Sequence, residues 1–99
     1  PYHDEVNDQL KRFLADGGID VVSFDSLRAP NVEALGRITS AEVANMARQV
    51  MTDACDAMFI ACSQLPTFDI LHSLSAEFGR PVLSSIQATA HQLRTTLQL

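Results

Sequence analysis

Apolar residues recur at helical spacing in four stretches of the chain. In the first stretch, Val6, Leu10 and Phe13 lie on one face of a helix, and Gly17 follows as a stop signal. In the second, Thr39 or Ser40 provides an N-cap ahead of an apolar stripe. The predicted helices span residues 4–16, 39–50, 67–78 and 87–97.

Three compact apolar runs lie between these helices. The run 57–61 contains only apolar side chains, which is typical of a strand buried on both faces of a parallel sheet. Residues 25–38 are predicted to be irregular, because Pro30 and Gly36 interrupt them. The predicted strands span residues 19–24, 57–61 and 81–85.

The alternation of helix and strand predicts an α/β fold, in which helices cover both faces of a short parallel sheet in three αβα layers. A chain of 99 residues is long enough for one domain, so we expect residues 1–99 to form a single α/β domain. Three strands make a thin sheet, and the chain opens abruptly at Pro1 without an initiator Met. We therefore expect a piece of a longer protein, with a fourth strand ahead of Pro1.

Composition narrows the classes of partner. The chain is 46% hydrophobic and 19% charged, and its net charge is −5 with Lys11 as its one lysine. No basic stripe is available to neutralise phosphates, which argues against a nucleic-acid partner. No apolar stretch is long enough to predict a membrane span. The two cysteines are predicted to be reduced thiols in a cytoplasmic protein, because their spacing does not match a zinc site.

Ligands of open α/β sheets bind at the carboxyl ends of the strands, so the turns that follow the predicted strands are candidate sites. Cys62 opens one of these turns, directly after the run 57–61 and ahead of the helix predicted from Thr67. Backbone N–H groups and the positive end of a helix would stabilise a thiolate there. An ordinary buried cysteine is the alternative for Cys62 at this point. Cys55, at the other end of the strand, is predicted to be structural.

Hydroxyl and amide groups gather in the turn after the third predicted strand, at Ser84, Ser85, Gln87 and Thr89. They could bind a carboxylate, or they could simply cap the last helix. The three histidines are not spaced as a set of metal ligands. We therefore predict no metal site.

Three segments are similar to one known family. The opening PYHDEVNDQLKRFL, the central DAMFIACSQLPTFDIL and the closing FGRPVLSSIQATAHQLR resemble, in order and spacing, the maleate cis–trans isomerase and arylmalonate decarboxylase branch of the Asp/Glu/hydantoin racemase superfamily. The resemblance covers nearly the whole chain. It implies a flavodoxin-like half of a two-domain enzyme, with this chain as the second domain and the active site between the domains.

The resemblance also implies roles for individual residues. Cys62 matches the catalytic cysteine of the second domain, and Tyr2 matches a tyrosine that hydrogen-bonds a substrate carboxylate. Asn31 matches a substrate-binding asparagine, and the backbone N–H groups of Ser63 and Gln64 would complete an anion hole. The family mechanism needs no metal or organic cofactor. Without the first domain, we expect the isolated chain to be inactive.

These matches predict a maleate-isomerase-like enzyme that acts on a small dicarboxylate. The alternatives are an arylmalonate-decarboxylase-like enzyme in which Cys62 donates a proton, an amino-acid or hydantoin racemase, or a non-catalytic assembly module. The expected partners are a small carboxylate substrate, the first domain of the parent enzyme, and further copies in a homo-oligomer.

Overall fold

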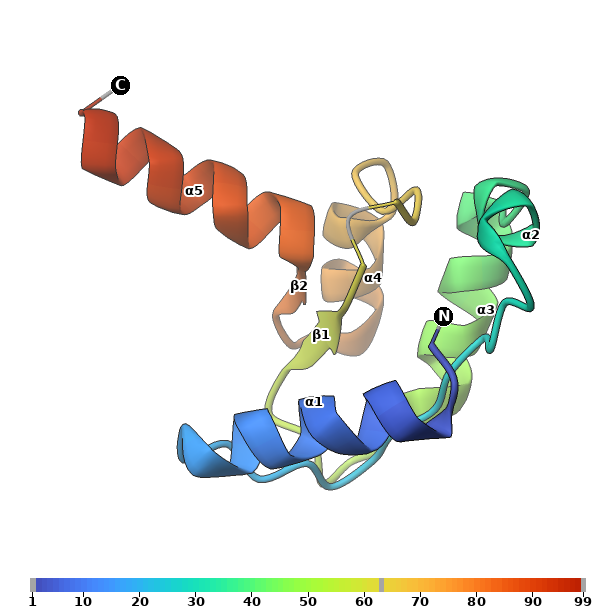
Figure 1. Ribbon diagram of the computed structural model, residues 1–99. Helices are drawn as coiled ribbons and strands as arrows, with labels where there is room; N and C mark the ends of the chain where they lie inside the picture. The colour runs from blue at the N-terminus through green and yellow to red at the C-terminus, as the bar shows by residue number, and fades with distance from the viewer. Residues whose placement is uncertain (1, 63, 99) are drawn as a thin grey trace.

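The computed structural model describes residues 2–62 and 64–98. Within these residues the two strands pair in parallel, with Met58 opposite Val82 and Ile60 opposite Ser84. This arrangement confirms the predicted α/β class with a short parallel sheet (Figure 1). In chain order the elements are α1 (Asp4–Asp16), α2 (Val32–Gly36), α3 (Ser40–Val50), β1 (Met58–Ile60), α4 (Leu71–Phe78), β2 (Val82–Ser84) and α5 (Ser85–Leu97).

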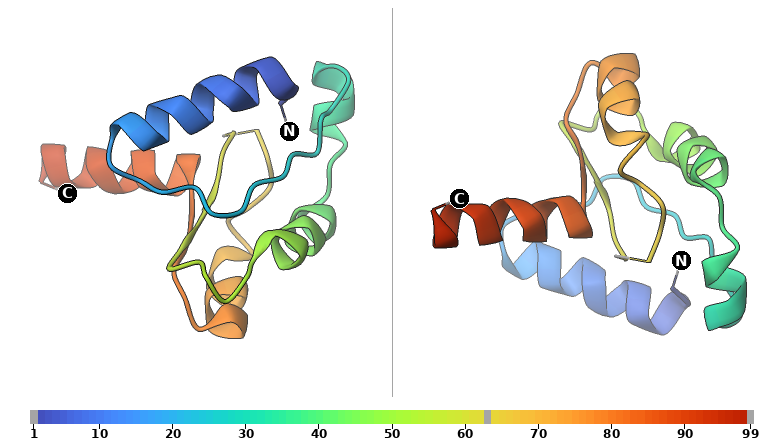
Figure 2. Two further views of the ribbon diagram at one scale, coloured as in Figure 1. Left: turned by 90° about the horizontal axis from the view of Figure 1, so that it is seen from below. Right: turned by 90° about the horizontal axis from the view of Figure 1, so that it is seen from above.

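The helices lie on opposite sides of the two strands. Both views in Figure 2 show α4 on one side of the strands and α1 on the other, which is the layered arrangement expected of an α/β fold. Helix α5 extends away from the end of β2, and none of its residues is buried. Because the two strands are parallel, the carboxyl ends of β1 and β2 lie at the same edge of the sheet, where α5 begins.

Local hydrogen bonds explain where the helices begin and end. The Thr39 hydroxyl accepts a bond from the N–H of Glu42, whose carboxylate accepts one from the N–H of Thr39, so a capping box starts α3. The Ser84 hydroxyl accepts from the N–H of Gln87 (3.2 Å) and starts α5. Gly79, at φ 65°, ends α4 in the left-handed conformation that glycine adopts without strain.

The strand predicted over residues 19–24 is not formed. These residues form neither helix nor strand, and they make no ladder with β1 or β2 in the described part of the chain. Ile19 and Val22 are 54% and 52% exposed, although their apolar side chains favour burial. An apolar pattern alone does not make a strand, because a strand also needs a neighbouring edge to accept its hydrogen bonds.

The helices also differ from the prediction. Helix α5 begins at Ser85 rather than at Gln87. Helix α4 begins at Leu71 rather than Thr67, because the carbonyl of Thr67 first accepts the N–H groups of Ile70 (3.0 Å) and Leu71 (3.1 Å) in a turn. A short helix, α2, lies within the segment predicted to be irregular. Its cap is the side chain of Asn31, which accepts from the N–H of Ala34 at 2.8 Å.

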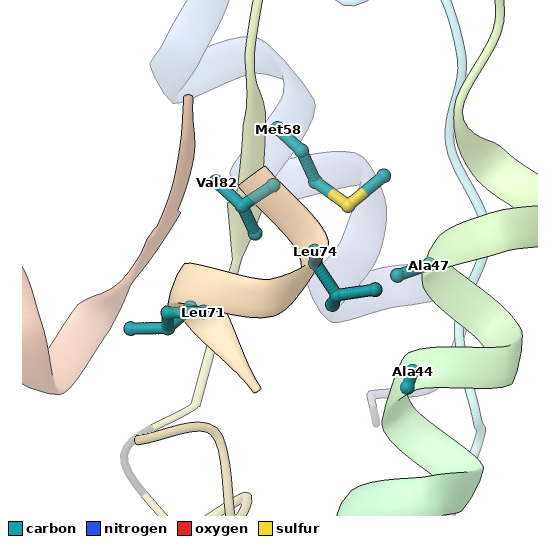
Figure 3. Packing of buried hydrophobic residues seen from close by; sticks show 6 residues of the cluster. All are labelled: Ala44, Ala47, Met58, Leu71, Leu74 and Val82. Carbon is teal, nitrogen blue, oxygen red and sulfur yellow. The ribbon is translucent and has the colours of Figure 1, made fainter. Parts of the chain in front are cut away.

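The hydrophobic core lies between α3, α4 and the strands. Figure 3 shows Leu74 of α4 pointing toward Met58 and Ala47, which belong to β1 and α3. Leu74 is 1% exposed, so its side chain is removed from water almost completely. The buried cluster consists of Ala44, Ala47, Met58, Leu71, Leu74 and Val82. This cluster holds β1, and with it the start of the 62–66 turn, in a defined position.

Candidate active site

Cys62 has an unusual backbone conformation at the carboxyl edge of the sheet. Its φ is 93°, a region that non-glycine residues enter at a cost of about 1–3 kcal/mol. Its N–H donates to the hydroxyl of Ser85 at 3.1 Å. Ser85 is the first residue of α5, so this bond joins the end of β1 to the positive end of a helix. Strain that is maintained by such a contact is a common feature of functional sites.

The helix next to Cys62 is not the one expected from the sequence. The helix that follows the turn begins only at Leu71, and no hydrogen bond joins its first residues to Cys62 in the described part of the chain. The neighbour is α5, which comes from the other strand of the sheet. The positive helix end predicted beside Cys62 is therefore supplied by a distant part of the chain.

Tyr2 lies beside Cys62. Partial burial raises the pKa of Tyr2, and the neighbouring Cys62 raises it further through the charge of its thiolate and a side-chain hydrogen bond. A tyrosine whose pKa is raised stays protonated near neutral pH and remains a hydrogen-bond donor. The fold thus brings together Tyr2 and Cys62, which lie 60 residues apart in the sequence.

Two buried polar side chains hold the backbone of Tyr2. Its carbonyl accepts from the side-chain amide of Asn7 at 2.9 Å and from the hydroxyl of Ser26 at 2.5 Å. Asn7 is 3% exposed and Ser26 is 8% exposed. Sequence reasoning did not select either residue, although Asn7 lies in the opening motif. The available sign was the position of Asn7, a polar residue one turn before Leu10 on an otherwise apolar helix face.

A cavity of about 110 Å³ reaches this edge of the sheet. Apolar residues of α1, α3 and β1 line most of it, together with Ala61 and with the polar residues Tyr2, Asn7, Asp25 and Ser26. Since Ala61 directly precedes Cys62, the cavity lies close to the backbone of Cys62, although Cys62 itself does not line it. The arrangement therefore offers a hydrogen-bond donor and a thiol side by side at the rim of an apolar space.

The other predicted site residues make no side-chain hydrogen bond to Cys62 in the described part of the chain. Gln64 is exposed in a tight turn, which the N–H of Leu65 closes by donating to the carbonyl of Cys62 at 3.2 Å. Ser63 lies outside the described residues. The side-chain oxygen of Asn31 caps α2, and the structure gives it no hydrogen bond to Tyr2 or Cys62.

Cys55 is buried at the opposite end of β1, as predicted for a structural thiol. Its sulfur lies 3.4 Å from the hydroxyl of Thr52, and the hydrogen bond to Thr52 lowers the pKa of Cys55. Across residues 2–62 and 64–98, no group of three or more His, Cys, Asp or Glu side chains is arranged to hold a metal ion. None of the helices in these ranges is long and apolar enough to cross a membrane.

The fold and the Tyr2–Cys62 pair define an α/β domain with a candidate thiol at the carboxyl edge of its sheet. Comparison with known proteins supplies the family. The sequence model described as arylmalonate decarboxylase matches residues 1–99, and the chain belongs to this family. The resemblance drawn from the sequence motifs is thereby confirmed.

Individual relatives include both kinds of enzyme in this branch. A maleate isomerase of Geobacillus stearothermophilus is 25% identical over the whole chain, and an arylmalonate decarboxylase of Bordetella bronchiseptica is 30% identical over 88% of it. A crystal structure of arylmalonate decarboxylase superposes on 85% of the chain with a TM-score of 0.76 at 29% identity. The chain spans 40%, 37% and 38% of the length of these three proteins, respectively.

Proposed function

We propose that the full-length protein is a cofactor-independent cis–trans isomerase of a small dicarboxylate, similar to maleate isomerase, with Cys62 as a reacting thiol. One observation carries the proposal: Cys62 is held at φ 93° beside Tyr2, at the edge of the sheet where α/β proteins bind ligands. Two relatives named maleate isomerase match along the whole chain, which supports this choice of reaction.

Tyr2 would bind a substrate carboxylate. A tyrosine hydroxyl is ordinarily protonated near neutral pH, and the raised pKa of Tyr2 shifts it further in that direction, so it can donate to an anion. The net charge of −5 gives no long-range attraction for a dicarboxylate, and local neutral donors must therefore hold it. Such donors stabilise a developing enediolate strongly where water is excluded.

Cys62 would exchange a proton with the substrate. In the isomerase, a thiolate from another part of the full-length protein adds to one alkene carbon, and the electron pair moves to the adjacent carbon and its carboxylate. Cys62 supplies a proton to that carbon from the opposite face. Rotation about the resulting single bond follows. Cys62 then removes the proton, the first thiolate leaves, and the double bond forms again in the trans isomer.

A decarboxylase is the second candidate, because the matching family model and the 30% identical relative are arylmalonate decarboxylases. In this reaction the bond to one carboxylate breaks and carbon dioxide leaves. The electron pair stays on the substrate as an enediolate, which takes the proton of the Cys62 thiol. The thiolate then regains a proton from water. Cys62 has the same role as a proton donor in both reactions.

The two candidates are separated by incubating the full-length protein with maleate and, separately, with phenylmalonate. We expect proton NMR to show fumarate formed from maleate, with no carbon dioxide released from phenylmalonate. The 99-residue chain alone is the control and is expected to be inactive. Carbon dioxide release without fumarate would replace the isomerase by the decarboxylase. Turnover of neither compound would contradict both assignments.

Replacing Tyr2→Phe in the full-length enzyme is expected to lower kcat/KM by about tenfold to a hundredfold. The variant removes one hydrogen bond to a charged group, which contributes about 1.5–3 kcal/mol. The backbone contacts of Tyr2 with Asn7 and Ser26 do not involve its hydroxyl, so the fold should persist. Steady-state kinetics and a thermal melt on the same sample check this. Unchanged kinetics would contradict a substrate-binding role.

A further inference from the structure

Two consecutive serines lie where β2 passes into α5, and their hydroxyl groups have different partners. Ser84 is the last residue of β2 and is 1% exposed, and its hydroxyl accepts the N–H of Gln87 at 3.2 Å, which caps α5. Ser85 is the first residue of α5 and is half-buried, and its hydroxyl accepts the N–H of Cys62 at 3.1 Å. Because Ser84 already caps the helix, capping does not account for the side chain of Ser85.

The register of the sheet explains why a side chain is needed at this position. The N–H of Met58 donates to the carbonyl of Pro81 at 2.9 Å, and a parallel ladder repeats every two residues. A continued ladder would therefore join the N–H of Cys62 to the carbonyl of Ser85. Ser85 already belongs to α5, however, and its carbonyl accepts the hydroxyl of Thr89 at 2.9 Å. The hydroxyl of Ser85 thus takes the place of its own carbonyl and extends the pairing of the two strands by one bond.

This bond holds Cys62 in its left-handed conformation. The carbonyl of Cys62 accepts the N–H of Leu65 at 3.2 Å, so both backbone groups of Cys62 are bonded while its φ is 93°. A non-glycine residue keeps such a conformation only where its surroundings enforce it. Because the Cα–Cβ bond is fixed to the backbone, the bonds that hold this φ also set the direction in which the thiol points.

Tyr2 lies on the side toward which the thiol points. A side-chain hydrogen bond between Tyr2 and Cys62 contributes to the raised pKa of Tyr2. The backbone of Tyr2 is held by Asn7 and Ser26, whose side chains donate to its carbonyl at 2.9 Å and 2.5 Å. The relative position of the phenol and the thiol therefore depends on two backbones that are each held by side-chain hydrogen bonds.

We propose that Ser85 is a positioning residue of the active site, whose hydroxyl holds the backbone of Cys62 and thereby keeps the thiol beside Tyr2. Ser85 acts through Cys62 and needs no contact with the substrate. The proposal rests on the proposed function in so far as Cys62 is the reacting thiol, but the place of the thiol beside Tyr2 does not depend on which reaction follows. Without the hydroxyl, Cys62 relaxes toward negative φ and its thiol moves away from Tyr2.

The structural part of the proposal is tested by NMR on the full-length enzyme. In Ser85→Ala we expect the amide of Cys62 to exchange with solvent about tenfold faster or more, because its acceptor is lost. The nuclear Overhauser effect between the ring of Tyr2 and the β-protons of Cys62 should be lost as well. Ser85→Thr keeps a hydroxyl and should restore both signals. The matched control is Ser73→Ala on α4, which removes an exposed hydroxyl that donates to the carbonyl of Ile70, and it should change neither.

The catalytic part is tested by steady-state kinetics on the same samples. In Ser85→Ala we expect kcat to fall by about tenfold to a hundredfold, since a small misplacement of a reacting group can cost about a hundredfold in rate. KM should stay nearly unchanged, because the hydroxyl of Tyr2 still binds the substrate. Ser85→Thr should recover most of kcat, and Ser73→Ala should keep all of it. A role in stability alone would lower the melting temperature without this separation of kcat from KM.

Three results would overturn the proposal. An Overhauser effect between Tyr2 and Cys62 that persists in Ser85→Ala would show that the hydroxyl does not place the thiol. A normal kcat in a variant that has lost this effect would show that the placement is not needed. Failure of Ser85→Thr to restore either signal would show that the hydroxyl is not the group that matters. If the unmodified enzyme converts neither maleate nor phenylmalonate, the proposed function fails, and the Overhauser effect alone decides the role of Ser85.

Discussion

Replacing Cys62→Ser in the full-length enzyme is expected to reduce turnover by at least 10²–10⁴-fold, because proton transfer by a positioned group contributes about this much. The serine hydroxyl keeps the size and hydrogen-bonding capacity of the thiol, but it stays protonated near neutral pH. The N–H of Cys62 that bonds Ser85 belongs to the backbone, so the local geometry should survive. Turnover, substrate affinity and thermal stability are measured on one sample.

The matched control for this experiment is Cys55→Ser. Cys55 is buried and hydrogen-bonded to Thr52, so a change there should alter stability more than turnover. The expected result is a large loss of turnover with a nearly unchanged melting temperature for the Cys62 variant, and the reverse pattern for Cys55. Near-normal turnover of the Cys62 variant would show that Cys62 is an ordinary half-buried cysteine. It would contradict both candidate mechanisms, because each needs Cys62 as a proton donor.

Replacing Leu74→Ala is expected to lower the free energy of unfolding by about 2–5 kcal/mol, since a buried leucine loses both its transfer free energy and its packing. Leu74 is 1% exposed and lies against Met58 and Ala47, which belong to different elements and cannot close a gap by a local shift (Figure 3). Urea unfolding of the 99-residue chain, followed by circular dichroism, measures the change.

Leu93→Ala on α5 is the matched control for Leu74. It removes the same atoms from a helix, but Leu93 is 54% exposed, so its loss should change the free energy of unfolding by less than about 1 kcal/mol. Similar effects of the two substitutions would contradict the position of the core between α3, α4 and the sheet.

Some of the fold could be predicted from the sequence because it depends on neighbours along the chain. The capping box of Thr39 and Glu42 and the left-handed Gly79 are local devices, and they place the start of α3 and the end of α4 where the sequence predicts them. The apolar run 57–61 similarly predicts β1 within one or two residues. The α/β class follows from the order of these elements.

The short helix α2 shows where local signals compete. Pro30 and Gly36 indicated an irregular segment, yet the side chain of Asn31 accepts the N–H of Ala34 and starts a helix between them. Asn31 is also the residue for which the family resemblance implies a substrate-binding role. A polar residue in a turn can do either, and the sequence pattern does not distinguish a cap from a ligand.

The sequence by itself predicted α1, α3, α4 and α5, apart from the first residues of α4 and α5, and the strands β1 and β2, because periodicity and caps are properties of consecutive residues. Only the tertiary structure decided that Tyr2 lies beside Cys62, that the first residue of α5 bonds the backbone of Cys62, and that residues 19–24 form no ladder with the described strands. The physical reason is common to all three. Each depends on contacts between segments far apart in the chain, and a strand edge or a buried polar group is satisfied only by the partner that the fold brings to it.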